Sequence, residues 1–198
     1  MNFSMTMNKV KNQKGVSLIE VLVTLVLISV ALLGSASLQV ISKRANSQAL
    51  QRSAAAHFAN DYLSKMRSNR PALAAYIPAA DLGAASLGGA PAKSCLGAGA
   101  NCVAAELADF DQWLWEQELD GATEMVADAK SGGLLEPTAC ITGPAAGAAG
   151  VYQIAIAWRG NTEHVNPIIH DCGEDSGKYG ADNGYRHVLV MNAFIDNN

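Results

Sequence analysis

The chain contains little charge and no catalytic motif. Asp, Glu, Lys and Arg make up 16% of its 198 residues, against about 25% in an ordinary soluble domain. It has no nucleophile elbow, no phosphate-binding glycine loop and no metal-protease helix. It also has no C-x-x-C pair, which argues against a zinc site. These absences predict that the protein is not an enzyme and that it uses no metal and no cofactor.

Proline is missing from the first 70 residues, and charge is nearly missing from residues 16–41. Residues 16–33 are 18 positions interrupted only by Ser17, Glu20, Thr24 and Ser29. As a helix they span about 27 Å, close to the ~30 Å hydrocarbon core of a bilayer. Three lysines and no acid precede them: Lys9, Lys11 and Lys14. We therefore expect the amino end to stay in the cytoplasm and the rest of the chain to be exported.

Glu20 is the only charged side chain within residues 16–41. An acid at mid-bilayer costs about 2.5–3.5 kcal/mol, so such a residue usually has a function and a partner. Two plainer interpretations of the apolar run stay open. One is an uncleaved anchor, and the other is a secretory signal cut after Gly34-Ser35-Ala36 so that Ser37 becomes the first residue. The length of the run and the acid near its start argue against the second interpretation.

No helix breaker follows Gly34 until Pro71. Apolar residues from Leu38 to Met66 recur at spacings of mostly three and four, as on an amphipathic helix. One helix over residues 16–69 would be about 80 Å long. A small domain cannot enclose such a rod. We therefore expect its first half to protrude into lipid or partner subunits and its second half to pack on a head domain, with a bend favoured near Gly34.

All four cysteines lie beyond the apolar run, at Cys95, Cys102, Cys140 and Cys172. An even number confined to the exported part is typical of disulfides formed outside the cytoplasm. Three pairings are possible. We favour Cys95–Cys102, which closes a short Gly/Ala loop, and Cys140–Cys172, which ties a strand to a loop. Free or metal-bound thiols are the alternative.

The remaining chain predicts an α+β head. Residues 71–103 are rich in Ala, Gly and Pro and indicate a loop, and residues 104–119 indicate a helix with a stripe of Leu107, Phe110 and Leu114. Trp113 and Trp115 face different sides of that helix, so we expect one in the core. Strands are expected at residues 138–142, 151–159 and 185–195, forming an antiparallel sheet on which the long helix packs. The second of these shows a period of two, in which one set of residues alternates with the other: Tyr152, Ile154, Ile156 and Trp158 against Gln153, Ala155, Ala157 and Arg159.

Removal of residues 1–15 would leave 11 basic and 18 acidic side chains, a formal charge of −7. This acidity argues against nucleic acid as a partner. Four scattered histidines are interpreted as surface or sheet residues: His57, His164, His170 and His187. The loop 171–175, with Asp182 and Asn183, collects oxygen ligands. A solvated polar loop is the favoured interpretation there, and calcium is the alternative.

Lys14-Gly15-Val16-Ser17-Leu18-Ile19-Glu20 resembles the cleavage signature of type IV prepilins and type II secretion pseudopilins. In that family a basic leader ends in Gly and is followed by an apolar helix whose fifth residue is Glu. Val16 is a departure, since many members carry Phe or Met there. Three further segments resemble the type IV pilus modification minor pilins (the PilV group): residues 60–67, 110–113 and 152–158.

The resemblance implies a type IV pilin fold and a division into a leader (1–15), an apolar helix half (16–40) and an exported head (41–198). A prepilin peptidase would cut between Gly15 and Val16 and N-methylate Val16. In the filament, Glu20 would pair with the Val16 amine of a neighbouring subunit. In low dielectric its main effect would be on register, because an unpaired carboxylate penalises wrong offsets.

The implied function is that of a minor pilin that helps to initiate type IV pilus assembly near the tip, supporting twitching motility and adhesion. Its partners would be other minor pilins, the major pilin, the prepilin peptidase and the inner-membrane assembly machinery. The protein would be held in the inner membrane before assembly and would be extracellular or periplasmic after it. The alternatives are a minor pseudopilin of type II secretion and a membrane-anchored adhesin or DNA-uptake receptor.

Overall fold

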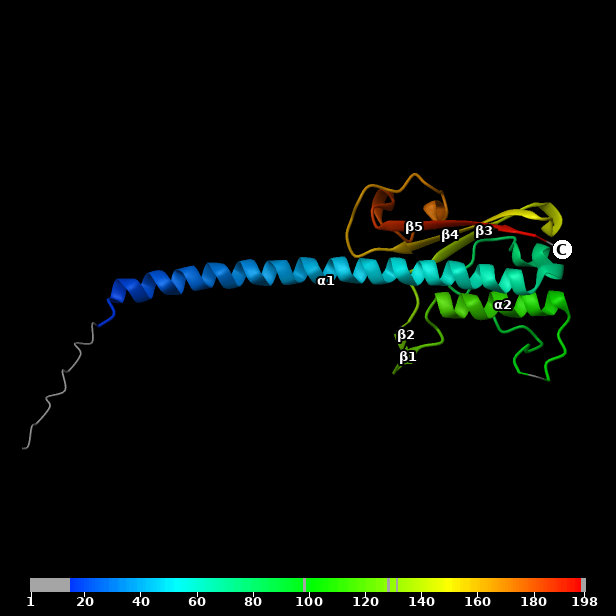
Figure 1. Ribbon diagram of the computed structural model, residues 1–198, viewed down its shortest axis with the longest axis horizontal. Helices are drawn as coiled ribbons and strands as arrows, with labels where there is room; N and C mark the ends of the chain where they lie inside the picture. The colour runs from blue at the N-terminus through cyan, green and yellow to red at the C-terminus, as the bar shows by residue number, and fades with distance from the viewer. Residues whose placement is uncertain (1–14, 98, 128, 131, 197–198) are drawn as a thin grey trace, which may run out of the picture. The chain divides into compact units, whose positions relative to one another are not determined.

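The computed structural model describes residues 15–97, 99–127, 129–130 and 132–196 (Figure 1). The three lysines and most of the predicted leader lie outside these residues. The chain is divided into two compact units with the boundary after Ala45. Unit 1 comprises the residues up to Ala45 and unit 2 comprises residues 46–198.

Helix α1 (Leu18–Ser68) runs through both units and confirms the long helix predicted over residues 16–69. It continues through Gly34, where a bend was expected and where an added Cβ would meet nothing within 4 Å. It ends just before Asn69, whose φ of −127° leaves the helical region. Pro71 lies in the first turn of the 3-10 helix η1 (Arg70–Tyr76), because proline fits the first turn of a helix but not its interior.

Unit 1 consists, in its described part, of residues 15–17 and the first half of α1. All of its described side chains are exposed, the aliphatic ones from Val16 to Ile41 included. By length and composition alone, α1 is the one helix of the described chain that is able to cross a membrane. The predicted apolar stripe is therefore exposed here, and only its later part, from Ala55 onward, is buried in the head.

Unit 2 has three layers, with residues 46–68 of α1 between a sheet and helix α2 (Ala104–Leu119) (Figure 1). The antiparallel sheet has the order β3-β4-β5, formed by β3 (Thr138–Thr142), β4 (Gly150–Arg159) and β5 (Arg186–Ile195). A separate two-stranded hairpin, β1 (Met125–Val126) and β2 (Ala129–Lys130), was not predicted. The 3-10 helices η2 (Ala145–Gly147), η3 (Glu174–Ser176) and η4 (Ala181–Asn183) lie in the connections.

The core lies between α1 and the sheet. From the sheet it takes Tyr152, Ile154, Ile156 and Trp158, which alternate along β4 as predicted. From α1 it takes Ala55, Ala59, Tyr62, Leu63 and Met66, which share one helix face. Trp115 of α2 completes it, with its ring 4.8 Å from that of Tyr62.

The face of β4 opposite the core is covered as well. Ala155 and Ala157 lie on this face, and both are fully buried. They form a second small cluster with Cys172 and Tyr179. These two residues belong to the connection 160–185 between β4 and β5, which folds back over this face of the sheet. Alternation in the sequence could not show this cover, because it comes from a distant loop.

The buried face of α2 also differs. Leu107 and Leu114 of the predicted stripe are only partly buried, and Phe110 is buried. The face that meets the core carries Ala108, Gln112, Trp115, Glu116 and Leu119. Gln112 donates to the carbonyl of Ala75 at 2.7 Å, and Glu116 accepts several bonds described below. Polar residues therefore occupy a buried face. Trp115 is in the core and Trp113 is partly exposed, as expected.

Candidate functional site

The residues of the expected cleavage and assembly site lie at the start of α1. The carbonyl of Ser17 accepts the N–H of Glu20 at 3.0 Å and that of Val21 at 3.3 Å, which closes the first turn. Gly15 and Val16 therefore precede the helix on exposed backbone. An added Cβ at Gly15 would meet nothing within 4 Å. The Gly15–Val16 peptide bond is thus exposed and lies outside the hydrogen-bonded helix.

Glu20 lies in the first turn of α1, where the helix dipole favours an acid. Its side chain is exposed, and no hydrogen bond or ion pair to it is found within the described parts of the chain. The hydroxyls of this run behave differently, because Thr24 donates to the Val21 carbonyl and Ser29 to the Leu25 carbonyl, at 2.9 and 2.7 Å. Hydroxyls bonded to their own helix tolerate an apolar surrounding, whereas Glu20 still needs a partner.

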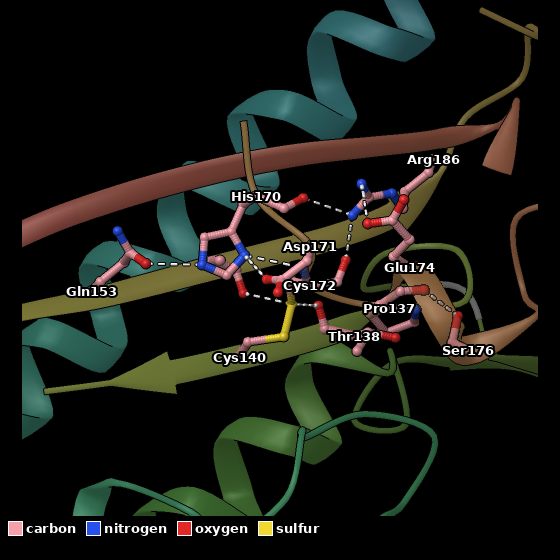
Figure 2. Close-up of a disulfide and its surroundings, with 12 residues drawn as sticks. Pro137, Thr138, Cys140, Gln153, His170, Asp171, Cys172, Glu174, Ser176 and Arg186 are labelled. Carbon is pink, nitrogen blue, oxygen red and sulfur yellow. Dashed lines mark hydrogen bonds and ion pairs between the residues drawn. A yellow bond between two sulfur atoms is a disulfide. The ribbon is translucent and has the colours of Figure 1, made fainter. Parts of the chain in front are cut away.

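The four cysteines form two disulfides, Cys95–Cys102 and Cys140–Cys172. These are the two pairs favoured from the sequence. The first closes a loop with a sequence separation of 7, and the second ties β3 to the connection 160–185 across a separation of 32. Figure 2 shows the second disulfide with Arg186 and His170 beside it.

Arg186 holds the backbone around Cys172. Its guanidinium is fully buried and donates to the carbonyls of His170 and Cys172 at 2.9 and 2.7 Å (Figure 2). It also donates to the carbonyl of Pro167 at 2.8 Å. His170 adds a second tie, because its Nδ1 accepts the Cys172 N–H at 3.0 Å and its Nε2 lies 2.8 Å from Gln153 Oε1 on β4. Arg186 also donates to the Asn166 side chain at 2.9 Å and lies 3.9 Å from Glu174 Oε2. These oxygens stabilise a buried positive charge.

The acidic loop 171–175 does not gather into a metal site. Among the described residues, no group of three or more His, Cys, Asp or Glu side chains is placed to hold a metal ion. Glu174 is engaged elsewhere, since its Oε1 accepts from Asn166 at 2.9 Å and its Oε2 lies 3.9 Å from Arg186. The oxygens that calcium would need are thus partly used within the loop.

Two acids, Glu116 of α2 and Asp120 directly after its end, hold the loop 83–87. Glu116 Oε1 accepts the backbone N–H groups of Gly83 and Ser86, each at 2.7 Å, and its Oε2 accepts that of Leu87 at 3.0 Å. One turn later, Asp120 accepts the N–H groups of Ala84 and Ala85. Burial by itself would raise the pKa of Glu116, but the hydrogen bonds from Ser86, Gly83 and Leu87 outweigh it and lower the pKa below 4.5.

His187 faces the core side of the sheet. It stacks on Trp158 and lies 4.3 Å from His164, measured between ring centroids. Burial lowers its pKa, and the nearby His164 and Arg52 lower it further. At neutral pH the His187 ring is therefore uncharged and packs as an aromatic side chain on the sheet, in agreement with its interpretation as a sheet residue. His57 is exposed on α1, as expected.

Comparison with protein families gives two adjoining matches. Residues 10–36 match the prokaryotic N-terminal methylation motif, and residues 37–113 match the type IV pilin Tt1218 family. Together they run without a gap from the leader into α2. The chain belongs to the type IV pilin-like family. A search of curated proteins and a search of solved structures find no match.

The fold of this pilin-like chain is the α+β type IV pilin fold, with a long amino-terminal helix, an antiparallel sheet and two disulfides. Its family is one of structural pilins and not of enzymes, and the methylation motif with the apolar helix fits a membrane-anchored pilin. The sheet of this pilin lies outside both matched segments.

Sequence reasoning missed Glu116, Asp120 and Arg186, which hold the loops of the pilin head. A signal for the first two was present. Gln112, Glu116 and Asp120 recur every four residues on α2, which places three polar groups on one helix face. For Arg186 no sequence signal existed, because its partners are backbone carbonyls that any residue provides.

Proposed function

We propose that this pilin is a minor pilin of the type IV pilus that takes part in the initiation of pilus assembly near the tip. The observation that carries the proposal is the exposed carboxylate of Glu20 at the start of the apolar helix α1. Glu20 is the fifth residue after Gly15, lies exposed in the first turn of an apolar helix, and falls inside the methylation motif. Such a carboxylate requires a cation among packed apolar helices, and the free amine of Val16 on a neighbouring subunit is one.

In this proposal the prepilin peptidase removes residues 1–15 and N-methylates Val16. Residues 16–40 hold the subunit in the inner membrane, with the amino end on the cytoplasmic side, and residues 41–198 form the exported head. On assembly the subunit moves into the pilus beside the major pilin and other minor pilins, with the help of the inner-membrane machinery. Twitching motility and adhesion depend on the pili so formed. No catalysis, cofactor or nucleic acid enters this role.

A minor pseudopilin of type II secretion is the second candidate, because the cleavage signature serves both systems. The two disulfides and the PilV-like segments favour the pilus. Deletion of the gene separates the two functions: loss of twitching supports the pilus, and loss of exoenzyme secretion supports the pseudopilin. A membrane-anchored adhesin would instead show ligand binding by the head with no effect on either system.

The test of the assembly contact is Glu20→Ala. Membrane insertion should persist, because the substitution makes α1 more apolar, while recovery of this subunit in sheared pili should be lost. Glu20→Asp is the matched control, since it keeps the charge on a shorter side chain and should retain part of the incorporation. Normal recovery of the Glu20→Ala subunit in sheared filaments, with normal piliation, would rule out the pairing role.

A further inference from the structure

His170 joins strand β4 to residues 167–173, the segment that carries Cys172 and that we call the cysteine loop. Its Nδ1 accepts the Cys172 N–H at 3.0 Å, and its Nε2 lies 2.8 Å from Gln153 Oε1 (Figure 2). Gln153 Nε2 in turn donates to Asn192 Oδ1 of β5 at 2.9 Å. One chain of hydrogen bonds therefore runs from the cysteine loop across two strands of the sheet.

The direction of this chain is fixed by its first member. A backbone N–H can only donate, so the His170 Nδ1 that accepts from Cys172 carries no proton. The proton of the ring is then on Nε2, which donates to Gln153 Oε1. That leaves the Gln153 amide nitrogen to donate to Asn192, as observed. A doubly protonated ring has no acceptor, so the whole arrangement requires neutral His170.

A second partner for Nδ1 is already close to the ring. Asp171 Oδ1 lies 3.2 Å from His170 Nδ1. An ionised carboxylate can only accept, so it forms no hydrogen bond with Nδ1 while that nitrogen is unprotonated. When Nδ1 gains a proton, it faces the Cys172 N–H donor to donor, whereas Asp171 can accept from it. Because 17% of the His170 side chain is exposed, water can deliver that proton.

The charged groups that face His170 lie around a cavity of about 530 Å³ beside the Cys140–Cys172 disulfide. The acids that line it with His170 are Asp81, Asp171, Glu174 and Asp175. From β5, the Arg186 guanidinium donates to the His170 carbonyl at 2.9 Å, and β4 contributes the neutral Gln153. Within the described parts of the chain, Asp171 is the acid at ion-pair distance from the ring. It is therefore the acceptor for a proton on Nδ1.

We propose that His170 is a pH-sensitive switch on the cysteine loop. Neutral His170 holds Cys172 to β4. A proton taken up from water onto Nδ1 transfers the bond of that nitrogen to Asp171 and releases the Cys172 N–H. The carbonyl bonds to Arg186 persist, so the loop loosens around Cys172, now 3% exposed, without unfolding. The switch involves unit 2 alone and does not depend on the assembly role proposed above.

The first test follows the ring and the loop by NMR of the full ¹⁵N-labelled chain in detergent micelles. Histidine changes its charge between about pH 8 and about pH 5, which sets the range of the titration. At the upper end His170 should show the Nε2–H tautomer and the Cys172 amide should exchange slowly with solvent. As the ring gains its second proton, exchange at Cys172, corrected for its intrinsic pH dependence, should become severalfold faster.

Two variants separate the parts of the switch. His170→Asn is the matched control, because its side-chain oxygen takes the place of Nδ1 as acceptor and does not titrate. Exchange at Cys172 should stay slow in this variant over the whole pH range. Asp171→Asn removes the anionic acceptor for the protonated ring, so it should move the transition of the Cys172 amide to lower pH.

The second test measures the reduction of both disulfides by a water-soluble phosphine, which takes an oxygen from water to become the phosphine oxide and leaves two thiols. Cys95–Cys102 is the internal control, because it closes a separate loop before α2. The ratio of the two rates cancels the pH dependence of the reagent. The rate for Cys140–Cys172 relative to the control should rise severalfold as the pH falls, and should stay constant in His170→Asn.

Three results would overturn the proposal. One is a neutral His170 ring that carries its proton on Nδ1, because the chain of bonds would then run differently. Another is exchange at Cys172 that does not change while the ring takes up its second proton. The third is an equal rise of the reduction ratio in wild type and His170→Asn, which would assign the effect to an acid of the cavity. The wild-type titration decides the first two whether or not a variant folds.

Discussion

Replacement of Glu116 by alanine should loosen the loop 83–87 and destabilise the head. The carboxylate is fully buried and accepts three backbone N–H groups, besides the Ser86 hydroxyl at 2.5 Å. After the substitution these donors have no acceptor on α2. These N–H groups could reach water only if the loop 83–87 moved away from α2, and the bonds from Ala84 and Ala85 to Asp120 oppose that movement.

The expected magnitude follows from the number of donors left without a partner. Each buried donor without an acceptor costs about 1–3 kcal/mol, and partial opening of the loop recovers some of that cost. We therefore expect Glu116→Ala to lower the free energy of unfolding by about 3–5 kcal/mol. For a chain of this size, 1 kcal/mol corresponds to about 2–4 °C in Tm, so the Tm should fall by about 6–20 °C.

The pH dependence gives this prediction a second readout. The pKa of Glu116 is lower in the folded head than its ordinary value of 4.5. Its contribution to stability is therefore fully present above pH 4.5 and is lost as the pH falls through the folded pKa. Glu116→Gln keeps an oxygen for Gly83 and Ser86 but turns an amide N–H toward the Leu87 N–H. The stability difference between wild type and Glu116→Gln should shrink below pH 4.5.

The assay is thermal unfolding of the full chain in detergent micelles, followed by near-UV circular dichroism from the tryptophans. Asp109→Ala is the control, since Asp109 is an exposed acid of the same helix and should shift the Tm only slightly. Equal Tm values for Glu116→Ala and Asp109→Ala would refute the argument that the carboxylate holds the loop.

Two further predictions concern the sheet region. Removing the Cys140–Cys172 disulfide by a double serine substitution should lower the free energy of unfolding by about 3.7 kcal/mol, against about 2.5 kcal/mol for Cys95–Cys102, because closing the longer loop restricts the unfolded chain more. Chemical denaturation measures both losses, and a larger loss for the shorter loop would contradict this entropic explanation. His187 has a lowered pKa in the folded protein, so its contribution to stability is present above pH 6.5 and is lost as the pH falls through the folded pKa. His187→Gln should therefore reduce the slope of the free energy of unfolding against pH below pH 6.5. An unchanged slope would show that another group titrates in that range.

Much of the fold could be predicted because it follows from local patterns. The absence of proline before Pro71 and the spacing of apolar residues predict α1, and the alternation of Tyr152, Ile154 and Ile156 predicts β4. The cysteine pairs follow from loop lengths and from their position after the apolar run. In each case neighbours in the sequence carry the information that determines the structure.

What sequence reasoning missed depends on contacts between distant segments. Ala155 and Ala157 look like the open side of a strand until the connection 160–185 covers them. Glu116 and Arg186 look like surface charges until the loop 83–87 and the carbonyls of residues 167–172 surround them. A polar residue is read as exposed by default, and only the fold shows the backbone groups that satisfy it.

The residues proposed for cleavage and assembly are recognised from the motif, but their contacts are not. Gly15, Val16 and Glu20 are where the motif places them, at the start of α1. The partner of Glu20 belongs to another subunit in our proposal, so a single chain leaves its carboxylate exposed. The pairing of Glu20 with Val16 therefore stays a prediction that only assembled pili can test.

The central claim is that this pilin is processed at Gly15–Val16 before assembly. Mass spectrometry of the subunit recovered from the cell surface tests it most directly. The account predicts a mature chain that begins at Val16 and carries one added methyl group on its amine. A chain that begins at Ser37, or one that retains residues 1–15, would contradict it.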